Sequence, residues 1–311
     1  MKKILVTGGA GFIGTNLIKK LLLDNENKIT SLDCYFSGTK KNHLKGVRYI
    51  NGYTWDIFKI FKNEKFDLIF HFGEYSRIVN SFDDIEFVSN SILNGTPKVL
   101  NYALKCKAKV IYSASSSKFG NMGKDENLSP YAWMKAKMVE LIKNYNSWFN
   151  LQYEITYFFN VYGPRQIYEG AYSTVVAIFE RQFLNNEKCT VVEPGTQTRD
   201  FTFVGDIVNG IIEIVDINKN YEWHFRSGIN TSIIDLAEMF GDWVLVKERR
   251  GERFVSEYFK SDTENLLNWK PQTKLSDWIK KQKNNISFTN LCRAEHSQRR
   301  SNLRRKSSCI R

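Results

Sequence analysis

The chain has 311 residues, of which 42% are hydrophobic and 25% charged, and its formal net charge is +12. This composition is typical of a globular protein with one large domain or two joined lobes. No apolar run approaches the roughly 20 residues of a membrane helix, and Gly8 and Gly9 interrupt the apolar stretch at the N-terminus. We therefore expect a cytoplasmic protein with no membrane segment.

The basic residues are concentrated near the C-terminal end. Residues 283–311 contain eight Lys or Arg and one Glu, so they carry +7 and the other 282 residues carry +5. We expect residues 282–311 to form a disordered basic tail, and any contact with nucleic acid to involve this tail alone. The five cysteines are scattered without a C-x-x-C pair, which predicts reduced thiols and no metal site.

The first elements in chain order are a strand, a glycine turn and a helix. Ile4–Val6 is a short apolar run, residues 7–14 read Thr-Gly-Gly-Ala-Gly-Phe-Ile-Gly, and Thr15–Leu23 has helical spacing. Glycines between a strand and a helix let backbone N–H groups approach a dinucleotide pyrophosphate. The alternative is an ordinary turn whose glycines only relieve crowding.

A carboxylate follows the second strand. Ile29–Leu32 is apolar and ends at Asp33, about twenty residues after the turn, where a ribose-binding acid is expected. Because an acid binds a ribose 2′-hydroxyl and repels a 2′-phosphate, we predict NAD and not NADP as the cofactor. Lys40 and Lys41 lie in a polar loop and are interpreted as solvated. The predicted NAD-binding residues in this part of the chain are Gly8, Gly11, Phe12, Ile13, Gly14 and Asp33.

The next segments continue the alternation of strands and helices. Residues 47–50 and 67–73 have the pattern of strands, and 82–105 has helical spacing, which Gly95-Thr96-Pro97 should kink or break. His71 lies inside a strand-like run, so we interpret it as a packed, hydrogen-bonded residue and not as a catalyst.

A fifth strand leads to a group of hydroxyl side chains. Residues 108–112 are followed by Ser-Ala-Ser-Ser-Ser at 113–117, and the carboxyl edge of a parallel sheet is where α/β proteins bind ligands. Ser129 then suits the N-cap of a helix and Pro130 its first position.

Tyr131 and Lys135 are four residues apart on that helix and share one face. An ammonium beside a phenol favours the phenolate and lowers its pKa, and Ser115 is placed to orient the same substrate hydroxyl. We therefore predict a catalytic set of Ser115, Tyr131 and Lys135, in which Tyr131 is the general base. The alternative is a surface lysine beside a packed tyrosine.

Together these features resemble the extended short-chain dehydrogenase/reductase family, in its branch of NAD-dependent nucleotide-sugar epimerases and dehydratases. The resemblance covers residues 1 to about 281 and rests on three further motifs: Asn-Val-Tyr-Gly-Pro-Arg-Gln at 160–166, Gly-Thr-Gln-Thr-Arg-Asp-Phe at 195–201 and Trp-Lys-Pro at 269–271. It implies an α/β fold, with a doubly wound parallel Rossmann sheet for NAD and a smaller C-terminal α/β lobe for the substrate.

The resemblance also implies a division of the chain. We expect residues 1–165 to form mainly the NAD-binding domain, with a segment at about 200–225 returning to it, and residues 166–281 to form mainly the substrate lobe. Relatives usually form homodimers, here through helices expected at 82–105 and 131–145.

On the substrate side, the resemblance implies that Asn160, Arg199 and Arg249 contact a nucleotide-diphosphate sugar. It also implies that Tyr131 and Lys135 contact NAD, with Lys135 on the nicotinamide ribose. The alternatives are a turn-forming asparagine and, at Arg249, a solvated charge run.

Two departures from the family pattern stand out. Tyr157 replaces a residue that is often arginine in similar proteins. Gly73-Glu74-Tyr75-Ser76-Arg77 replaces a stretch of small residues, so its polar groups either contact the sugar or form a solvated loop.

The residues after Ser115 bear on the reaction. In the family, 4,6-dehydratases have Asp and Glu at these two positions and decarboxylases usually keep an acid at the second, whereas this chain has Ser116 and Ser117. The sequence thus favours an epimerase that inverts C4 through a transient 4-keto sugar. Two alternatives remain: a nucleotide-sugar dehydrogenase, reductase or dehydratase, and a non-catalytic protein that binds NAD or nucleic acid.

Overall fold

The computed structural model describes residues 1–119, 125–170, 172–247 and 261–285. At its centre is a seven-stranded parallel sheet with the order β11-β6-β5-β4-β1-β2-β3. Its strands are Lys3–Thr7 (β1), Lys28–Asp33 (β2), Arg48–Asn51 (β3), Leu68–His71 (β4), Lys109–Ser115 (β5), Tyr153–Phe158 (β6) and Glu222–Phe225 (β11). The strand order changes direction between β1 and β4, which is where such sheets bind ligands.

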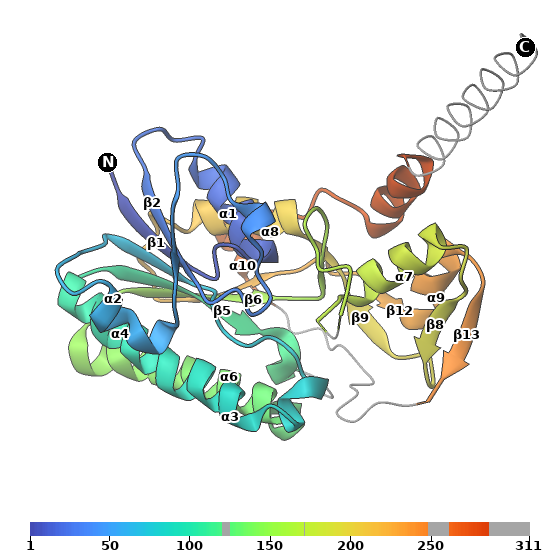
Figure 1. Ribbon diagram of the computed structural model, residues 1–311, viewed down its shortest axis with the longest axis horizontal. Coiled ribbons are helices and arrows are strands. Elements are labelled where there is room, and N and C mark those ends of the chain that lie inside the picture. Colours follow the sequence, from blue (N-terminus) through green and yellow to red (C-terminus); the bar gives the residue numbers. More distant parts are fainter. Residues whose placement is uncertain (120–124, 171, 248–260, 286–311) are drawn as a thin grey trace, which may run out of the picture.

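Helices cover both faces of this sheet (Figure 1). Successive strand residues point to opposite faces, so Leu5 of β1 lies in one core while Ile4 and Val6 lie in the other. The core around Leu5 is closed by α2 (Ile57–Ile60), α3 (Ile85–Ser89), α4 (Gly95–Cys106) and α6 (Pro130–Phe149). The opposite core is closed by α1 (Phe12–Leu21), α8 (Val204–Glu213) and α10 (Thr263–Leu267). The predicted doubly wound sheet is therefore confirmed.

The helical stretch 82–105 differs in detail from the expectation. After α3, residues 90–94 form a π-helical turn, and α4 continues directly from Gly95. Pro97 is the third residue of α4 and directly follows this π-helical turn, so the helical stretch continues past the proline.

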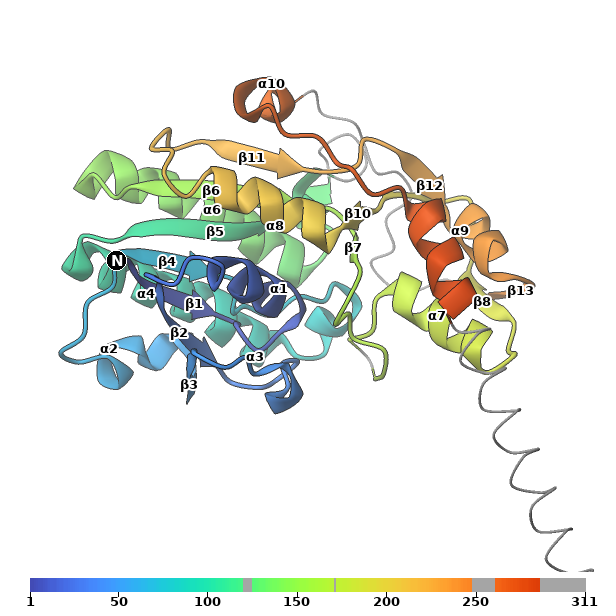
Figure 2. The ribbon, with the colours of Figure 1, turned by 90° about the horizontal axis from the view of Figure 1, so that it is seen from above.

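A smaller lobe lies beside the carboxyl ends of the strands (Figure 2). Its core contains Phe179, Leu236, Phe240 and Trp278. The main elements of this lobe are α7 (Val175–Leu184), β8 (Cys189–Val192), α9 (Ile233–Phe240) and β13 (Trp243–Val246). Three two-stranded pairs complete the fold: β8 with β13, β9 (Thr198–Asp200) with β12 (Asn230–Ser232), and β7 (Val161–Tyr162) with β10 (Thr202–Phe203).

The chain returns from this lobe to complete the large sheet. The edge strand β11 pairs with β6, and the buried carboxylate of Glu154 on β6 fixes the approach to it. Glu154 accepts hydrogen bonds from Trp223 Nε1 at 2.6 Å and from the backbone N–H of Lys219 at 2.9 Å. A segment late in the chain thereby belongs to the same layer as β1.

The described chain ends in a helix. Residues 275–285 are helical, and Lys283 Nζ donates to the carbonyls of Met239 at 3.1 Å and Phe240 at 3.0 Å, at the end of α9. The expected tail boundary at residue 282 therefore falls inside a helix, and residues 286–311 lie outside the described part.

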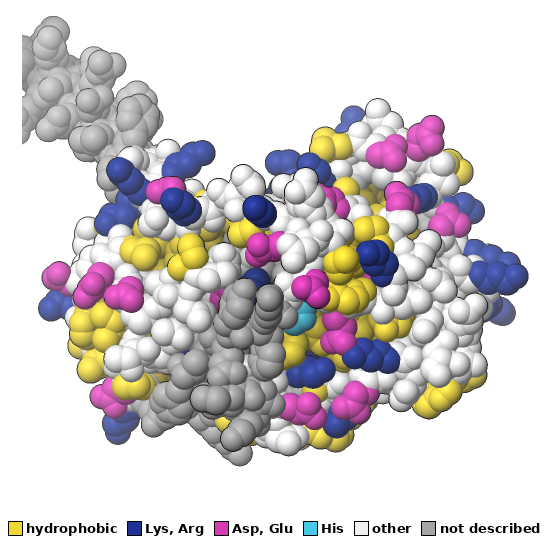
Figure 3. Space-filling model, turned by 180° about the vertical axis from the view of Figure 1, so that it is seen from behind, with side chains coloured by type: hydrophobic (Ala, Val, Ile, Leu, Met, Phe, Trp, Pro, Cys, Tyr) yellow, Lys and Arg dark blue, Asp and Glu magenta, His cyan; other side chains and the backbone are white. Residues whose placement is uncertain are grey.

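Charge is mixed over the described surface seen in Figure 3, where basic and acidic side chains are interspersed among uncharged ones. Within the described residues, no helix is long and apolar enough to cross a membrane.

Candidate active site

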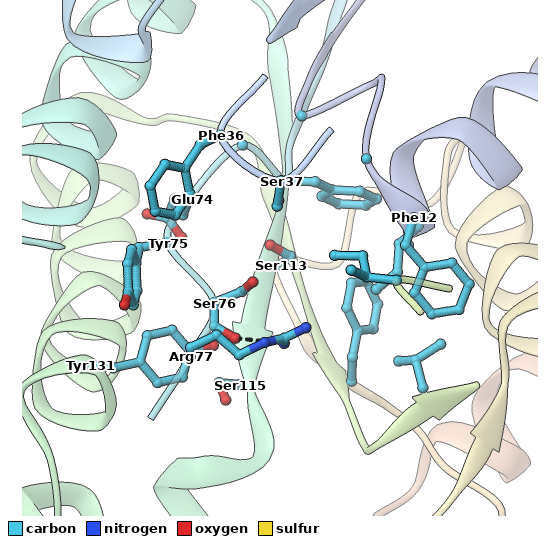
Figure 4. Close-up of a pocket in the computed structure, with 18 of the residues that line it drawn as sticks. Phe12, Phe36, Ser37, Glu74, Tyr75, Ser76, Arg77, Ser113, Ser115 and Tyr131 are labelled. Carbon is cyan, nitrogen blue, oxygen red and sulfur yellow. Dashed lines mark hydrogen bonds between the residues drawn. The ribbon is translucent and has the colours of Figure 1, made fainter. Parts of the chain in front are cut away.

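A cavity of about 730 Å³ opens along the carboxyl ends of the central strands. It contains eleven of the twelve predicted site residues, namely Gly8, Gly11, Phe12, Ile13, Gly14, Asp33, Ser115, Tyr131, Lys135, Asn160 and Arg199. The twelfth, Arg249, lies outside the described residues. Figure 4 shows Phe12 on the opposite side of this cavity from Tyr131.

The glycine turn brings three backbone segments into close contact. A Cβ atom at Gly14 would lie 2.2 Å from the Gly8 carbonyl oxygen, and one at Gly8 would lie 2.8 Å from Gly73 Cα. Gly8 also has φ of +70°, which glycine adopts without strain. Helix α1 starts after Gly11 with no side-chain cap, so its first N–H groups are open to an anion.

Asp33 ends β2 beside this turn and lines the same cavity. Its carboxylate accepts hydrogen bonds from the N–H groups of Ala10 at 2.9 Å and Tyr35 at 2.8 Å. Burial raises the pKa of Asp33, while these two hydrogen bonds oppose the rise. Lys40 and Lys41 are exposed, as expected for a solvated loop. The uncapped helix and the fixed carboxylate fit the pyrophosphate and adenosine ribose of a dinucleotide.

Ser115 and Tyr131 approach each other from β5 and α6 (Figure 4). Helix α6 begins as predicted, because Ser129 caps it by accepting a hydrogen bond from Ala132 N at 3.1 Å. Burial raises the pKa of Tyr131 to about 12, whereas a hydrogen bond with Ser115 and the nearby charge of Arg77 lower it.

The pKa of Tyr131 is thus raised and not lowered, mainly by burial, so the expected low pKa is wrong for this state of the protein. The Lys135 ammonium instead forms a buried ion pair with Glu74 and donates to the carbonyl of Ser113. Its charge is therefore balanced by a carboxylate that the sequence interpretation did not place in the site. The polar character of residues 73–77 was visible in the sequence, but the sequence did not show where the Glu74 side chain would lie in the fold.

The departures from the family pattern are also resolved. The Glu74 side chain is only 2% exposed, so a solvated loop is wrong for this residue. Tyr157 is buried on β6 and its hydroxyl donates to Glu222 at 2.6 Å. His71 is fully buried and hydrogen-bonded between Thr7 and Thr96, which confirms a packed residue.

The second half of the chain also contributes polar groups to the cavity. Asn160 Nδ2 donates to the Asp200 carbonyl at 3.0 Å, and Arg199 donates to the Thr198 carbonyl at 2.8 Å. Both residues line the cavity that contains Tyr131. The two lobes thus share one cavity.

The two residues after Ser115 are also serines, and one of them donates hydrogen bonds to the Ser115 hydroxyl. Ser117 donates to Ser115 Oγ through its backbone N–H at 3.2 Å and its hydroxyl at 2.9 Å. Ser116 and Ser117 are both buried. In the described chain no group of three His, Cys, Asp or Glu side chains is arranged to hold a metal ion.

The arrangement of the site agrees with the protein family that the sequence matches. The sequence model of the "NAD dependent epimerase/dehydratase family" matches residues 4–224. The chain belongs to this family. Members of the NAD-dependent epimerase/dehydratase family act on nucleotide sugars and use NAD, so this chain is an NAD-dependent enzyme of nucleotide-sugar chemistry.

Individual relatives carry out different reactions. A putative UDP-glucose 4-epimerase from Methanocaldococcus jannaschii is 30% identical over 300 residues, which cover 89% of this chain and 96% of the relative. UDP-glucuronic acid decarboxylase 3 from Arabidopsis thaliana is 26% identical over 305 residues, covering 89% and 86%. A UDP-glucuronic acid 4-epimerase from Bacillus cereus, solved with UDP-glucuronic acid and NAD, is 25% identical with a TM-score of 0.81, covering 92% and 99%. The family is thus established, and the reaction depends on the residues of this site.

Proposed function

We propose that this chain is an NAD-dependent epimerase that inverts C4 of a nucleotide-diphosphate sugar through a transient 4-keto intermediate. The observation that carries the proposal is the pair of buried hydroxyls, Ser116 and Ser117, beside an otherwise complete set of Ser115, Tyr131 and Lys135 in one cavity. Elimination of water needs an acid and a base at these two positions, whereas epimerisation needs only the complete set.

In the proposed mechanism, Ser115 orients the sugar 4-hydroxyl and Tyr131 removes its proton. Bound NAD supplies reversible hydride chemistry at sugar C4. The 4-keto sugar then turns in the cavity and presents its other face, after which Tyr131 returns the proton to the oxygen. Asn160 and Arg199 hold the diphosphate while the sugar turns, because both line the cavity at its substrate side.

Glu74 does not supply the carboxylate that a dehydratase would need. Its oxygens accept hydrogen bonds from Thr96, Tyr112 and Lys135, so they are already engaged by these three donors. This engagement supports the epimerase over the dehydratase alternative. A non-catalytic role is disfavoured by the presence of the complete catalytic set in a single cavity.

The proposal is tested by incubating the purified protein and NAD with UDP-glucose, UDP-galactose and a panel of other nucleotide sugars. We expect interconversion of two C4 epimers without net formation of NADH. Tyr131→Phe should lower kcat by about 10²- to 10⁴-fold, because the general acid–base is lost. Tyr145→Phe is the matched control, since Tyr145 lies on the same helix and is absent from the lining of the cavity.

Two results would contradict this reaction. Stoichiometric NADH formation would indicate a dehydrogenase, and accumulation of a keto sugar that has lost water would indicate a dehydratase. Unchanged activity of Tyr131→Phe would remove Tyr131 from the mechanism.

We also propose that the enzyme is a homodimer that associates through α3, α4 and α6. The support is apolar: Trp133, Trp148 and Phe149 of α6 and Ile85 of α3 are exposed. Such residues are common at protein–protein interfaces, and sedimentation equilibrium measures the association.

A further inference from the structure

The cavity that contains Tyr131 and Lys135 also holds a buried carboxylate, that of Glu74. Glu74 follows β4, and its side chain is 2% exposed while that of Lys135 is 5% exposed. Its Oε1 atom accepts hydrogen bonds from the Thr96 hydroxyl and, at 3.3 Å, from the Tyr112 hydroxyl, and Oε2 accepts one from Lys135. Glu74 also lines the cavity that contains Tyr131. A buried charge of this kind is stable only when it is paired and hydrogen-bonded.

A chain of hydrogen bonds that runs from Thr7 through His71 and Thr96 holds Glu74 in place. Thr7 Oγ1 accepts from the N–H groups of Phe72 at 3.1 Å and Gly73 at 2.9 Å, so its own proton points to His71 Nδ1 at 2.8 Å. His71 Nε2 must then carry the proton and donate to Thr96 Oγ1 at 3.0 Å, which leaves the Thr96 hydroxyl to donate to Glu74. Burial lowers the His71 pKa to about 4, which agrees with a neutral imidazole.

The Lys135 ammonium is held in place by three contacts. It contacts Glu74 and the Ser113 carbonyl, and it lies 4.2 Å from the centroid of the Tyr112 ring. These three partners, Glu74 after β4 and Tyr112 and Ser113 on β5, thereby determine one position for the ammonium. A lysine without Glu74 would be a lone buried cation one helical turn from Tyr131.

The charges that face Tyr131 come from each element packed around it. Glu74 and Arg77 after β4 act on Tyr131, and Tyr112 on β5 is a neutral neighbour. Lys135 lies one helical turn from Tyr131 on α6 and is paired with Glu74. Glu74 raises the pKa of Tyr131 and Arg77 lowers it. The pairing of Glu74 with Lys135 therefore cancels the positive charge that would otherwise favour the phenolate.

We propose that Glu74 is a positioning residue of this active site, which fixes the Lys135 ammonium and neutralises its charge so that Tyr131 stays protonated in the ligand-free enzyme. This inference rests on the proposed function in that Tyr131 is the acid–base of the reaction. It assigns to a residue outside the family motif the control of when that tyrosine gives up its proton.

The first test measures Tyr131 directly, by tyrosinate ultraviolet absorbance during a pH titration of the cofactor-free protein. Subtracting the same titration of a Tyr131→Phe partner in each background isolates this tyrosine from the other 14 of the 15 in the chain. In Glu74→Gln the unpaired Lys135 should shift the titration of Tyr131 down by roughly one to three pH units. In the double variant Glu74→Gln/Lys135→Met the titration should return close to that of the wild type, because both charges are gone.

A second variant keeps the test decisive where Glu74→Gln does not fold. Lys135→Met leaves the carboxylate unpaired, so Tyr131 should titrate at higher pH than in the double variant. Replacement of a buried ion pair by neutral side chains is commonly tolerated, which makes the double variant a suitable reference.

The second test uses the pH dependence of kcat/KM. The increase of kcat/KM with rising pH should occur at lower pH in Glu74→Gln than in the wild type. It should return toward the wild-type position in Glu74→Asp, which restores the carboxylate. Glu140→Gln is the matched control, because it removes an exposed carboxylate of α6 that pairs with Lys137 at 2.9 Å. This variant should leave both the titration and the profile unchanged.

Equal titration of Tyr131 in the wild type, Glu74→Gln and the double variant would overturn the proposal and leave Glu74 as a structural residue. Failure of Glu74→Asp to restore the profile would do the same. The absorbance titration needs no substrate, so it decides the role of Glu74 even if no nucleotide sugar is epimerised and the proposed function fails.

Discussion

One fully buried and one half-buried histidine link single residues to the stability of the protein. Burial lowers the pKa of both His71 and His224 to about 4. A histidine in the unfolded chain titrates near 6.5, so below that pH the unfolded state binds more protons than the folded state. The contribution of these residues is therefore neutral above about pH 6.5 and becomes destabilising as the pH falls toward 4.

His224 offers a clean test of this effect, because it packs against two aromatic rings. Its ring centroid lies 5.1 Å from that of Phe119 and 4.8 Å from that of Tyr157. In His224→Phe, the slope of the free energy of unfolding against pH should decrease by up to about 1.4 kcal/mol per pH unit between about pH 6 and 5. Urea unfolding at a series of pH values measures the slope, and equal slopes for variant and wild type would contradict the prediction.

At the scale of residues, the site was predictable where its partners are close in sequence. Tyr131 and Lys135 share a face because four residues make about one helical turn. The pairing of Lys135 with Glu74 joins residues 61 positions apart, and only the packing of α6 against β5 and the segment after β4 brings them together. Local spacing therefore identified the lysine but not its charge balance.

At the scale of secondary-structure elements, the glycines of the turn between β1 and α1 serve different purposes. A methyl group at Gly14 would collide with the backbone of Gly8 at 2.2 Å, whereas one at Gly11 would lie 3.2 Å from the same carbonyl oxygen. Gly14→Ala should thus lower stability by about 1–3 kcal/mol through overpacking. Gly11→Ala should keep most of the stability and lose affinity for NADH, because Gly11 lines the cavity where helix α1 begins.

Thermal unfolding without cofactor and fluorescence titration with NADH separate the two effects. An equal loss of stability in both variants would show that Gly11 is also needed for packing. Retained NADH affinity in Gly11→Ala would remove the N-terminus of α1 from the cofactor site.

Among elements, the strands of the large sheet were predictable and the short pairs were not. Short apolar runs such as those in β1 and β4 are recognisable from composition. The strands β7 and β10 have two residues each, too few for any alternation to appear. The continuity of the helical stretch around Pro97 also depended on a π-helical turn that no local pattern indicated.

At the scale of the whole molecule, the charge is divided unevenly. Residues 286–311 contain seven Lys or Arg and one Glu, so they carry +6 of the total +12. Deletion of these residues should leave the enzymatic activity unchanged and lower the retention on heparin and RNA, since retention by charge depends on counterion release. The deletion keeps Lys283, whose contacts with the end of α9 belong to the fold.

The salt dependence of RNA binding by the full and shortened chains measures this effect. Equally tight binding by both would place the nucleic-acid contact on the body of the protein and strengthen the non-catalytic alternative.

The position of β11 has a consequence for how the protein is made. This strand completes the large sheet, yet it leaves the ribosome after α7, β8 and β9 of the smaller lobe. Until then, Glu154 lacks its hydrogen-bond donors around Trp223, and β6 presents an open edge to which another chain could pair. The large sheet of the nascent protein must therefore wait for α7, β8 and β9 of the smaller lobe before it can close.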